Sequence, residues 1–140
     1  MIRRGKLLYG ADYLVARWIA RRIPNYSATM ETRAIGVFEG EELIAGAAFD
    51  RYNGIHIEAC IAAEPGRAWA SRATLRGLFS YPFNQLGCAA ITVLVPSTNL
   101  ESLNLATKLG FRPEAMVAFA AHDQSTLIVL KMFRDHCMWI

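Results

Sequence analysis

The spacing of hydrophobic residues along the chain switches between a helical period and the short runs or alternation typical of strands. Helical spacing covers residues 11–23, which Pro24 ends, and residues 72–86. Pro82 lies inside the second segment and removes a backbone donor, so we expect a kink or an early end there. Short apolar runs bounded by turn residues predict strands at residues 3–9, 34–38, 43–49, 55–63, 90–95, 116–120 and 126–132.

A third helix is predicted over residues 99–109. Thr98 followed by Glu101 fits a capping box at its start, and Gly110 followed by Phe111 fits a left-handed stop at its end. The elements then follow the order β-α-β-β-β-α-β-α-β-β. This order predicts one domain over residues 1–140 of the α/β (α+β) class, with a mixed, mostly antiparallel central sheet and helices on both faces.

The composition is that of a globular protein with a large core: 140 residues, 54% hydrophobic and 19% charged. No apolar run reaches the roughly 18 residues of a membrane span, and Asp12 and Arg17 interrupt the first apolar stretch. We therefore expect a cytoplasmic protein with no membrane partner. The three cysteines form no CxxC pair, so they predict neither a disulfide framework nor a metal site.

The net charge of +3 is concentrated at the beginning of the chain, where residues 1–22 sum to +5 and leave −2 for the remainder. A basic segment of this kind attracts phosphate, nucleic acid or an acidic protein surface, but more often it is a solvated helix face. No aromatic-interleaved basic array or nucleic-acid module supports a nucleic acid partner.

Candidate catalytic side chains lie on the strand predicted at residues 55–63. Side chains alternate along a strand, so His56, Glu58 and Cys60 share one face. Four residues of strand separate His56 from Cys60 by roughly 13 Å, whereas a nucleophile and its base lie about 3 Å apart. A Cys–His nucleophile is thereby excluded, and Cys60 is expected to be a small buried side chain. Glu58 and His56 remain candidates for a general base, the alternative being that both line a polar mouth of the sheet.

Residues 61–72 join this strand to the next predicted helix. Such a junction presents free backbone N–H groups and the positive end of a helix, both of which favour phosphate. Arg67 and Arg72 add positive charge. The alternative is a helix start that merely carries arginines.

These segments resemble the GNAT superfamily of acyl-CoA-dependent N-acetyltransferases. Arg67-x-x-Ala70-x-Arg72 is similar to the family's Gln/Arg-x-x-Gly-x-Gly/Ala loop, although Ala70 and Arg72 depart from its small residues. Asn99 stands where the family has an Asn that contacts the cofactor, and the stretch Lys108-Leu109-Gly110-Phe111 follows at the expected distance. A looser resemblance, carried by residues 81–87 and 131–140, is to short members encoded by bacteriophages, which would place the protein in a bacterial host cell.

The resemblance implies a GNAT-like acyl-CoA N-acyltransferase fold and transfer of an acetyl group from acetyl-CoA to a primary amine, by direct attack in a ternary complex. Glu58 is then the leading general base, through a water, and His56 the second candidate. The implied cofactor site comprises backbone groups of one strand, N–H groups of the following loop, and side chains from both the loop and the next helix: Cys60, Ile61, Ala62, Arg67, Ala68, Trp69, Ala70, Ser71, Arg72, Ala73, Asn99 and Ser102.

The sequence departs from the family at Ala106, where many members have a Tyr that protonates the departing thiolate. Ser102, Tyr81 or solvent could take that role. The alternative is a non-catalytic GNAT-fold protein, such as a phage accessory or inhibitor protein that keeps the cofactor groove. The amine acceptor stays open among a protein, an aminoacyl group and a small molecule, and Trp139 and Ile140 are candidates for a homodimer interface.

Overall fold

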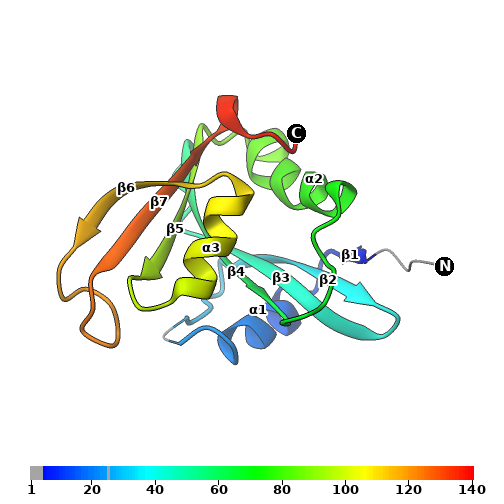
Figure 1. Cartoon of the computed structure of the whole chain (residues 1–140). Coiled ribbons are helices and arrows are strands. Elements are labelled where there is room, and N and C mark those ends of the chain that lie inside the picture. Colours follow the sequence, from blue (N-terminus) through cyan, green and yellow to red (C-terminus); the bar gives the residue numbers. More distant parts are fainter. Residues whose placement is uncertain (1–4, 25) are drawn as a thin grey trace.

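A seven-stranded mixed sheet organises the chain, in the order β1-β2-β3-β4-β5-β7-β6 (Figure 1). The computed structural model describes residues 5–24 and 26–140. The strands are β1 (Lys6–Leu8), β2 (Arg33–Glu39), β3 (Glu42–Asp50), β4 (His56–Ala63), β5 (Ala90–Pro96), β6 (Arg112–Val117) and β7 (Leu127–Phe133). The helices are α1 (Asp12–Ala20), α2 (Arg72–Ser80) and α3 (Leu100–Leu109), with a π-helical turn η1 (Tyr81–Gln85) and a 3-10 turn η2 (Arg134–His136).

The predicted order of elements is confirmed. Residues 3 and 4 of the first predicted strand lie outside the described residues, as does residue 25. Pro82 has the expected effect, because α2 ends at Ser80 and the chain continues as a π-helical turn. Gly110 adopts the left-handed conformation, with φ at 110°, and ends α3 as predicted.

The predicted capping box of α3 is wrong. Asn99, not Thr98, is the N-cap, and its Oδ1 accepts a hydrogen bond from the backbone N–H of Ser102 at 3.1 Å. The Thr98 hydroxyl instead donates to Asp123 in the turn between β6 and β7. Both residue types are good caps, so the sequence alone did not distinguish a start at one from a start at its neighbour.

Helices cover both faces of the sheet, α1 on one side and α2 and α3 on the other (Figure 1). On the α1 side, a Cβ added to Gly46 of β3 would lie 2.9 Å from Cγ1 of Val15, so α1 approaches the sheet where a side chain is missing. On the opposite side, Phe79 packs against Phe111 with ring centroids 6.1 Å apart. No helix in the described part of the chain combines the length and the apolar character needed to cross a membrane.

The central strands β4 and β5 diverge. Within the described residues they form the one parallel pair of the sheet, and their register contains three pairs, the last of which joins Glu58 to Thr92. β4 continues to Ala63 and β5 to Pro96 beyond that point. A gap therefore opens in the middle of the sheet, with α3 above it.

Candidate functional site

The gap between β4 and β5 connects two larger cavities. The gap itself has a volume of about 60 Å³ and is lined mainly by apolar residues of both strands and of α3. A cavity of about 570 Å³ lies between the loop after β4 and α3, and one of about 320 Å³ lies between the segment after α1 and the turn from β6 to β7. The gap shares lining residues with each of these cavities, so the two cavities adjoin opposite ends of the gap in the sheet.

Backbone groups of β4 border this gap. The Glu64 N–H donates to the carbonyl oxygen of Ile44 on β3 at 2.8 Å. Peptide groups alternate in direction along an antiparallel strand, so those of Cys60 and Ala62 pair with β3. The peptide groups of Ile61 and Ala63 point the other way, and the β4–β5 register has ended before them. Of the three residues expected to offer backbone groups, only Ile61 aims them into the gap.

The 320 Å³ cavity contains two carboxylates on facing positions of β3 and β4, Asp50 and Glu58. Oε2 of Glu58 lies 3.3 Å from Nε of Arg51, and Oδ2 of Asp50 accepts a hydrogen bond from the Tyr26 hydroxyl at 2.8 Å. Burial, together with Asp50, raises the pKa of Tyr26 well above its ordinary value, so the phenol stays protonated and donates. Glu58 thus lies in a defined cavity, as a general base requires.

His56 and Cys60 have different surroundings from Glu58. Nε2 of His56 lies 2.5 Å from Oγ1 of Thr92, and His56 is outside the lining of all three cavities. Cys60 lines the gap, and burial, with a smaller contribution from Asp50, raises the pKa of its thiol to about 12. A thiol that stays protonated is a poor nucleophile. The sequence predicts a small buried side chain at Cys60, and the structure leaves it partly buried.

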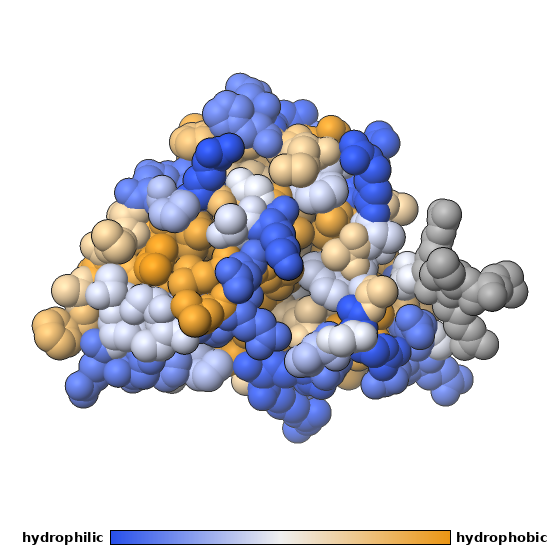
Figure 2. Space-filling model, in the orientation of Figure 1, coloured by the Kyte–Doolittle hydropathy of each residue, from blue (hydrophilic) through white to orange (hydrophobic). Residues whose placement is uncertain are grey.

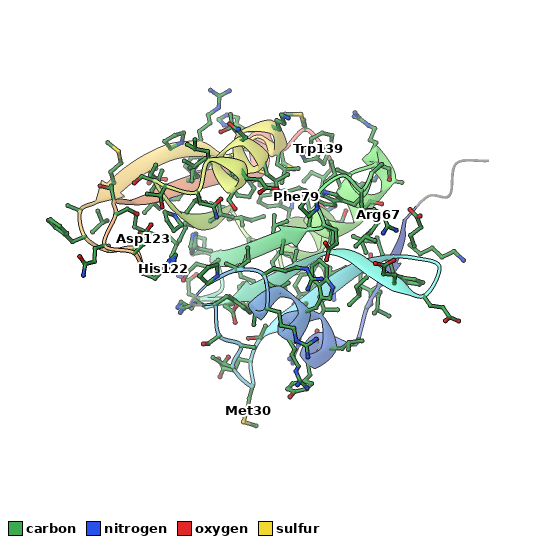
Figure 3. The ribbon with its side chains drawn as sticks, turned by 60° about the horizontal axis from the view of Figure 1, so that its bottom comes forward. Met30, Arg67, Phe79, His122, Asp123 and Trp139 are labelled. Carbon is green, nitrogen blue, oxygen red and sulfur yellow. The ribbon has the colours of Figure 1, made fainter. Side chains whose placement is uncertain are left out.

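The loop expected to bind phosphate contributes fewer groups than the sequence suggested. Arg67 and Trp69 line the 570 Å³ cavity. The guanidinium of Arg67 forms ion pairs with Glu39 at 3.4 Å and with Glu42 at 3.3 Å, beside the β2–β3 hairpin (Figure 3). The other expected loop residues lie outside the cavity lining: Ala68, Ala70, Ser71, Arg72 and Ala73.

The start of α2 is occupied by contacts within the protein. Oγ of Ser71 accepts a hydrogen bond from the Thr74 N–H at 3.2 Å, which caps the helix. The guanidinium of Arg72 instead reaches the carbonyl oxygen of Met138 near the end of the chain, at 3.5 Å. These residues stay predictions as cofactor contacts.

On α3, Asn99 and Ser102 line both the gap and the 570 Å³ cavity. Ala106 is buried in the wall of the gap, at the position where the resemblance to the GNAT superfamily implies a Tyr in many members. Of the suggested substitutes, Ser102 borders the gap, whereas the Tyr81 ring packs against Phe49 with centroids 5.2 Å apart. Figure 2 shows hydrophilic residues along the exposed side of α3 and a hydrophobic surface beside it.

Several residues of these cavities were not singled out by the sequence. Arg22 and Glu64 line the 570 Å³ cavity and form an ion pair. Asp50 and Arg51 line the other, and the left-handed backbone of Arg51, with φ at 56°, is uncommon for a residue other than glycine. His122 joins them from the turn between β6 and β7 (Figure 3). The basic excess of residues 1–22 was the one sequence signal for Arg22.

Comparison with known proteins identifies the fold. No protein-family model and no curated protein sequence matches the chain. A chimera of spermidine N-acetyltransferase SpeG from Vibrio cholerae and hSSAT superposes with a TM-score of 0.73 at 15% identity, over 94% of this chain and 96% of that chain. The Vibrio cholerae spermidine/spermine N-acetyltransferase SpeG with manganese ions gives 0.73 at 16% identity, over 94% of each chain.

A third solved structure is the Campylobacter jejuni N-acetyltransferase PseH in complex with acetyl coenzyme A. It superposes with a TM-score of 0.56 at 16% identity, over 75% of this chain and 70% of that chain. The mixed seven-stranded sheet with its three helices therefore has the fold of the GNAT acetyltransferases, and the predicted fold class is confirmed.

Proposed function

We propose that the protein is an N-acetyltransferase that moves an acetyl group from acetyl-CoA to a primary amine, by direct attack in a ternary complex. The observation that carries this proposal is the gap between β4 and β5, with a cavity at each end. Three basic and two acidic side chains border one cavity, and the other contains two carboxylates and one arginine. A donor and an acceptor that enter from opposite ends meet in the gap without a covalent enzyme intermediate.

Residues of the larger cavity fit the donor. The peptide groups of Ile61 and Ala63 are available to an amide-containing chain lying along β4, as another strand would be. Arg67 stands at the phosphate end, and Asn99 and Ser102 border the middle. Bound acetyl-CoA supplies the acetyl group as a reactive thioester, and a backbone N–H at the gap would stabilise the negative charge that develops on the carbonyl oxygen.

Glu58 is the proposed general base. An amine attacks only when it is neutral, so a proton has to leave the acceptor, and Glu58 is the carboxylate of the acceptor cavity that borders the parallel β4–β5 pairs. Its side chain is 23% exposed, which leaves room for a bridging water. The Tyr26 and Thr32 hydroxyls both donate to Asp50, so each oxygen of that carboxylate is already engaged within the protein.

The acceptor we propose to test first is a cationic amine, because the acceptor cavity contains two carboxylates, Asp50 and Glu58, against one arginine, Arg51. Two of the structural neighbours are named as spermidine acetyltransferases, so a polyamine belongs in the first panel, together with a lysine-containing peptide and an aminoacyl ester. A cytoplasmic location, an origin in a bacteriophage and a homodimer sealed by Trp139 and Ile140 stay predictions.

Ala106 favours a second candidate, a binding protein of this fold that keeps the cofactor groove without catalysis. An alanine side chain has no proton to give to the departing sulfur. General acid catalysis is worth roughly 10²- to 10⁴-fold, and an ordinary thiol titrates near 8.5, so thiolate departure into water still permits slow turnover. Loss of the Tyr therefore weakens the enzyme proposal without removing it.

Calorimetric titration with acetyl-CoA, followed by an assay for amine-dependent release of free thiol, separates the two candidates. Binding together with thiol release that requires an amine supports the enzyme. Binding with no release above the rate of the protein-free control supports the binding protein. Absence of binding at millimolar acetyl-CoA contradicts both, since both need the groove.

A further inference from the structure

Arg22 lies just past the end of α1 and borders the 570 Å³ cavity. Its guanidinium stacks 3.7 Å from the centroid of the Trp18 ring, and Nη1 donates to the Trp18 carbonyl oxygen at 3.1 Å. Nε and Nη2 both donate to the same carboxylate oxygen, Oε1 of Glu64, the first of them at 2.8 Å. Three of its nitrogens are therefore fixed in direction at the rim of the proposed donor site.

Glu64 follows β4 directly, and its backbone N–H is held by Ile44. Because both donors of Arg22 converge on Oε1, the planar fork of the guanidinium does not meet the two oxygens that it is shaped to bind. The side chains of Arg22 and Glu64 are 33% and 30% exposed, and ion pairs open to solvent contribute little to stability. A phosphate offers two oxygens to the same fork and carries more charge, so it is the stronger partner.

Besides Arg22, two cationic side chains border the cavity, those of Arg67 and Lys108. The start of α2 is capped by Ser71, and none of its residues borders the cavity. Arg67 is already shared by Glu39 and Glu42. Lys108 of α3 borders the cavity on the side opposite the β4 loop and adds a further positive charge, while Glu101 of the same helix adds a negative one. Arg22 and Lys108 are therefore the cations that can supplement Arg67 in meeting an anion here.

We propose that Arg22 binds a phosphate group of the acyl-CoA donor, and that Glu64 holds the guanidinium in position until the phosphate displaces its carboxylate. This inference rests on the proposed function. No covalent bond changes in the exchange: one anion replaces another on Nε and Nη2. Glu64 thus acts as an internal competitor that lowers the affinity for the donor and selects for ligands that carry phosphate.

The test is calorimetric titration of coenzyme A, dephospho-coenzyme A and pantetheine, which lacks phosphate, into the wild type and matched variants. Arg22→Gln should weaken coenzyme A binding by about tenfold or more, the worth of a charged hydrogen-bonded contact, and leave pantetheine unchanged. Glu64→Gln should tighten coenzyme A binding about two- to fivefold, the size of an exposed ion pair. Arg21→Gln and Glu31→Gln, which change the net charge equally at exposed positions outside the cavities, are the controls.

Dephospho-coenzyme A identifies the phosphate concerned. If the effect of Arg22→Gln persists with it, the diphosphate is the partner, and if the effect disappears, the 3′-phosphate is. Arg22→Lys keeps the positive charge without the planar fork, and it replaces Arg22→Gln in the test if that variant does not fold. It should also weaken coenzyme A binding. Unchanged coenzyme A affinity in Arg22→Lys would then overturn the inference.

Variants of Arg22 and Glu64 that bind coenzyme A no differently from the two controls would overturn this inference and leave the proposed function standing. An equal loss of pantetheine and coenzyme A affinity in Arg22→Gln would do the same, because the residue would then support the groove and not the phosphate. A wild type that fails to bind coenzyme A at millimolar concentration would instead remove the proposed function, and this inference with it.

Discussion

Replacing Asn99 with alanine or with serine separates the contribution of this side chain to helix stability from its proposed contact with the acyl donor. Oδ1 of Asn99 caps α3 through the Ser102 N–H at 3.1 Å. The same side chain borders both the gap and the 570 Å³ cavity, where its Nδ2 group would donate to the acyl donor. A serine can accept the capping bond but lacks the amide donor, whereas an alanine lacks both groups.

The two substitutions should therefore differ in stability and agree in affinity. Loss of an N-cap costs about 1 kcal/mol, which for a chain of this length lowers Tm by roughly 3–4 °C. Asn99→Ser, which restores a preferred cap, should stay within about 0.5 kcal/mol of the wild type. Both variants lose one hydrogen bond to the donor, worth about 1 kcal/mol, or roughly fivefold in Kd for coenzyme A.

Thermal unfolding followed by circular dichroism measures the first quantity, and calorimetric titration with coenzyme A measures the second. An Asn99→Ser variant that binds coenzyme A as tightly as the wild type would refute a contact to the donor and reduce Asn99 to a helix cap. An Asn99→Ala variant with unchanged Tm would instead refute the capping argument, because the hydrogen bond to Ser102 would then contribute nothing measurable.

Three further predictions concern the general base, the loop after β4 and the thiol of Cys60. Glu58→Gln should lower the rate of amine-dependent thiol release by roughly 10²- to 10⁴-fold and retain coenzyme A affinity. His56→Gln is the control, because this residue lies outside the cavities, and it should not lower that rate. An unchanged rate in Glu58→Gln would place the base elsewhere. Arg67→Gln should weaken coenzyme A binding in a salt-dependent way and Arg72→Gln should not, because only the first lines the cavity. Burial raises the pKa of Cys60 to about 12, so the thiol stays protonated in the native state, whereas an ordinary thiol ionises near 8.5. Denaturant titrations should therefore show that the free energy of unfolding of the wild type, relative to that of Cys60→Ala, does not change with pH below about 9 and falls by up to about 1.4 kcal/mol per pH unit between 9 and 12. Parallel curves for the two proteins would contradict this shift.

Local signals were sufficient to predict the order of elements. Pro82 ends α2 because a missing N–H acts within one turn, and Gly110 ends α3 because its left-handed backbone suits glycine. The start of α3 was misplaced by one residue because Thr98 and Asn99 are both good caps. A long-range contact distinguishes them, because Asp123, distant in the sequence, accepts a hydrogen bond from the Thr98 hydroxyl.

The candidate site was harder to predict because it depends on register and on distant contacts. Asp50 and Glu58 face each other only through the pairing of β3 with β4. Arg22 and Glu64 are 42 positions apart and meet because α1 and the end of β4 adjoin the same cavity. The expected loop was identified in sequence, but whether its N–H groups face a cavity depends on the direction in which α2 leaves the sheet, which no local pattern specifies.

The divergence of β4 and β5 argues for a ligand that behaves as a strand. Unpaired peptide groups inside a sheet are costly unless something satisfies them, and the apolar stretches Ala59–Ile61 and Val93–Val95 have the composition to continue the ladder if the strands closed. A gap kept open beneath α3 therefore fits an amide-containing ligand such as the pantetheine arm of coenzyme A. A binding protein and an enzyme both need that groove, but only an enzyme needs a second cavity that joins the groove from the far side and contains a carboxylate. Glu58 stands in that second cavity, and for this reason the acceptor side, more than the donor side, favours the transferase over its non-catalytic alternative.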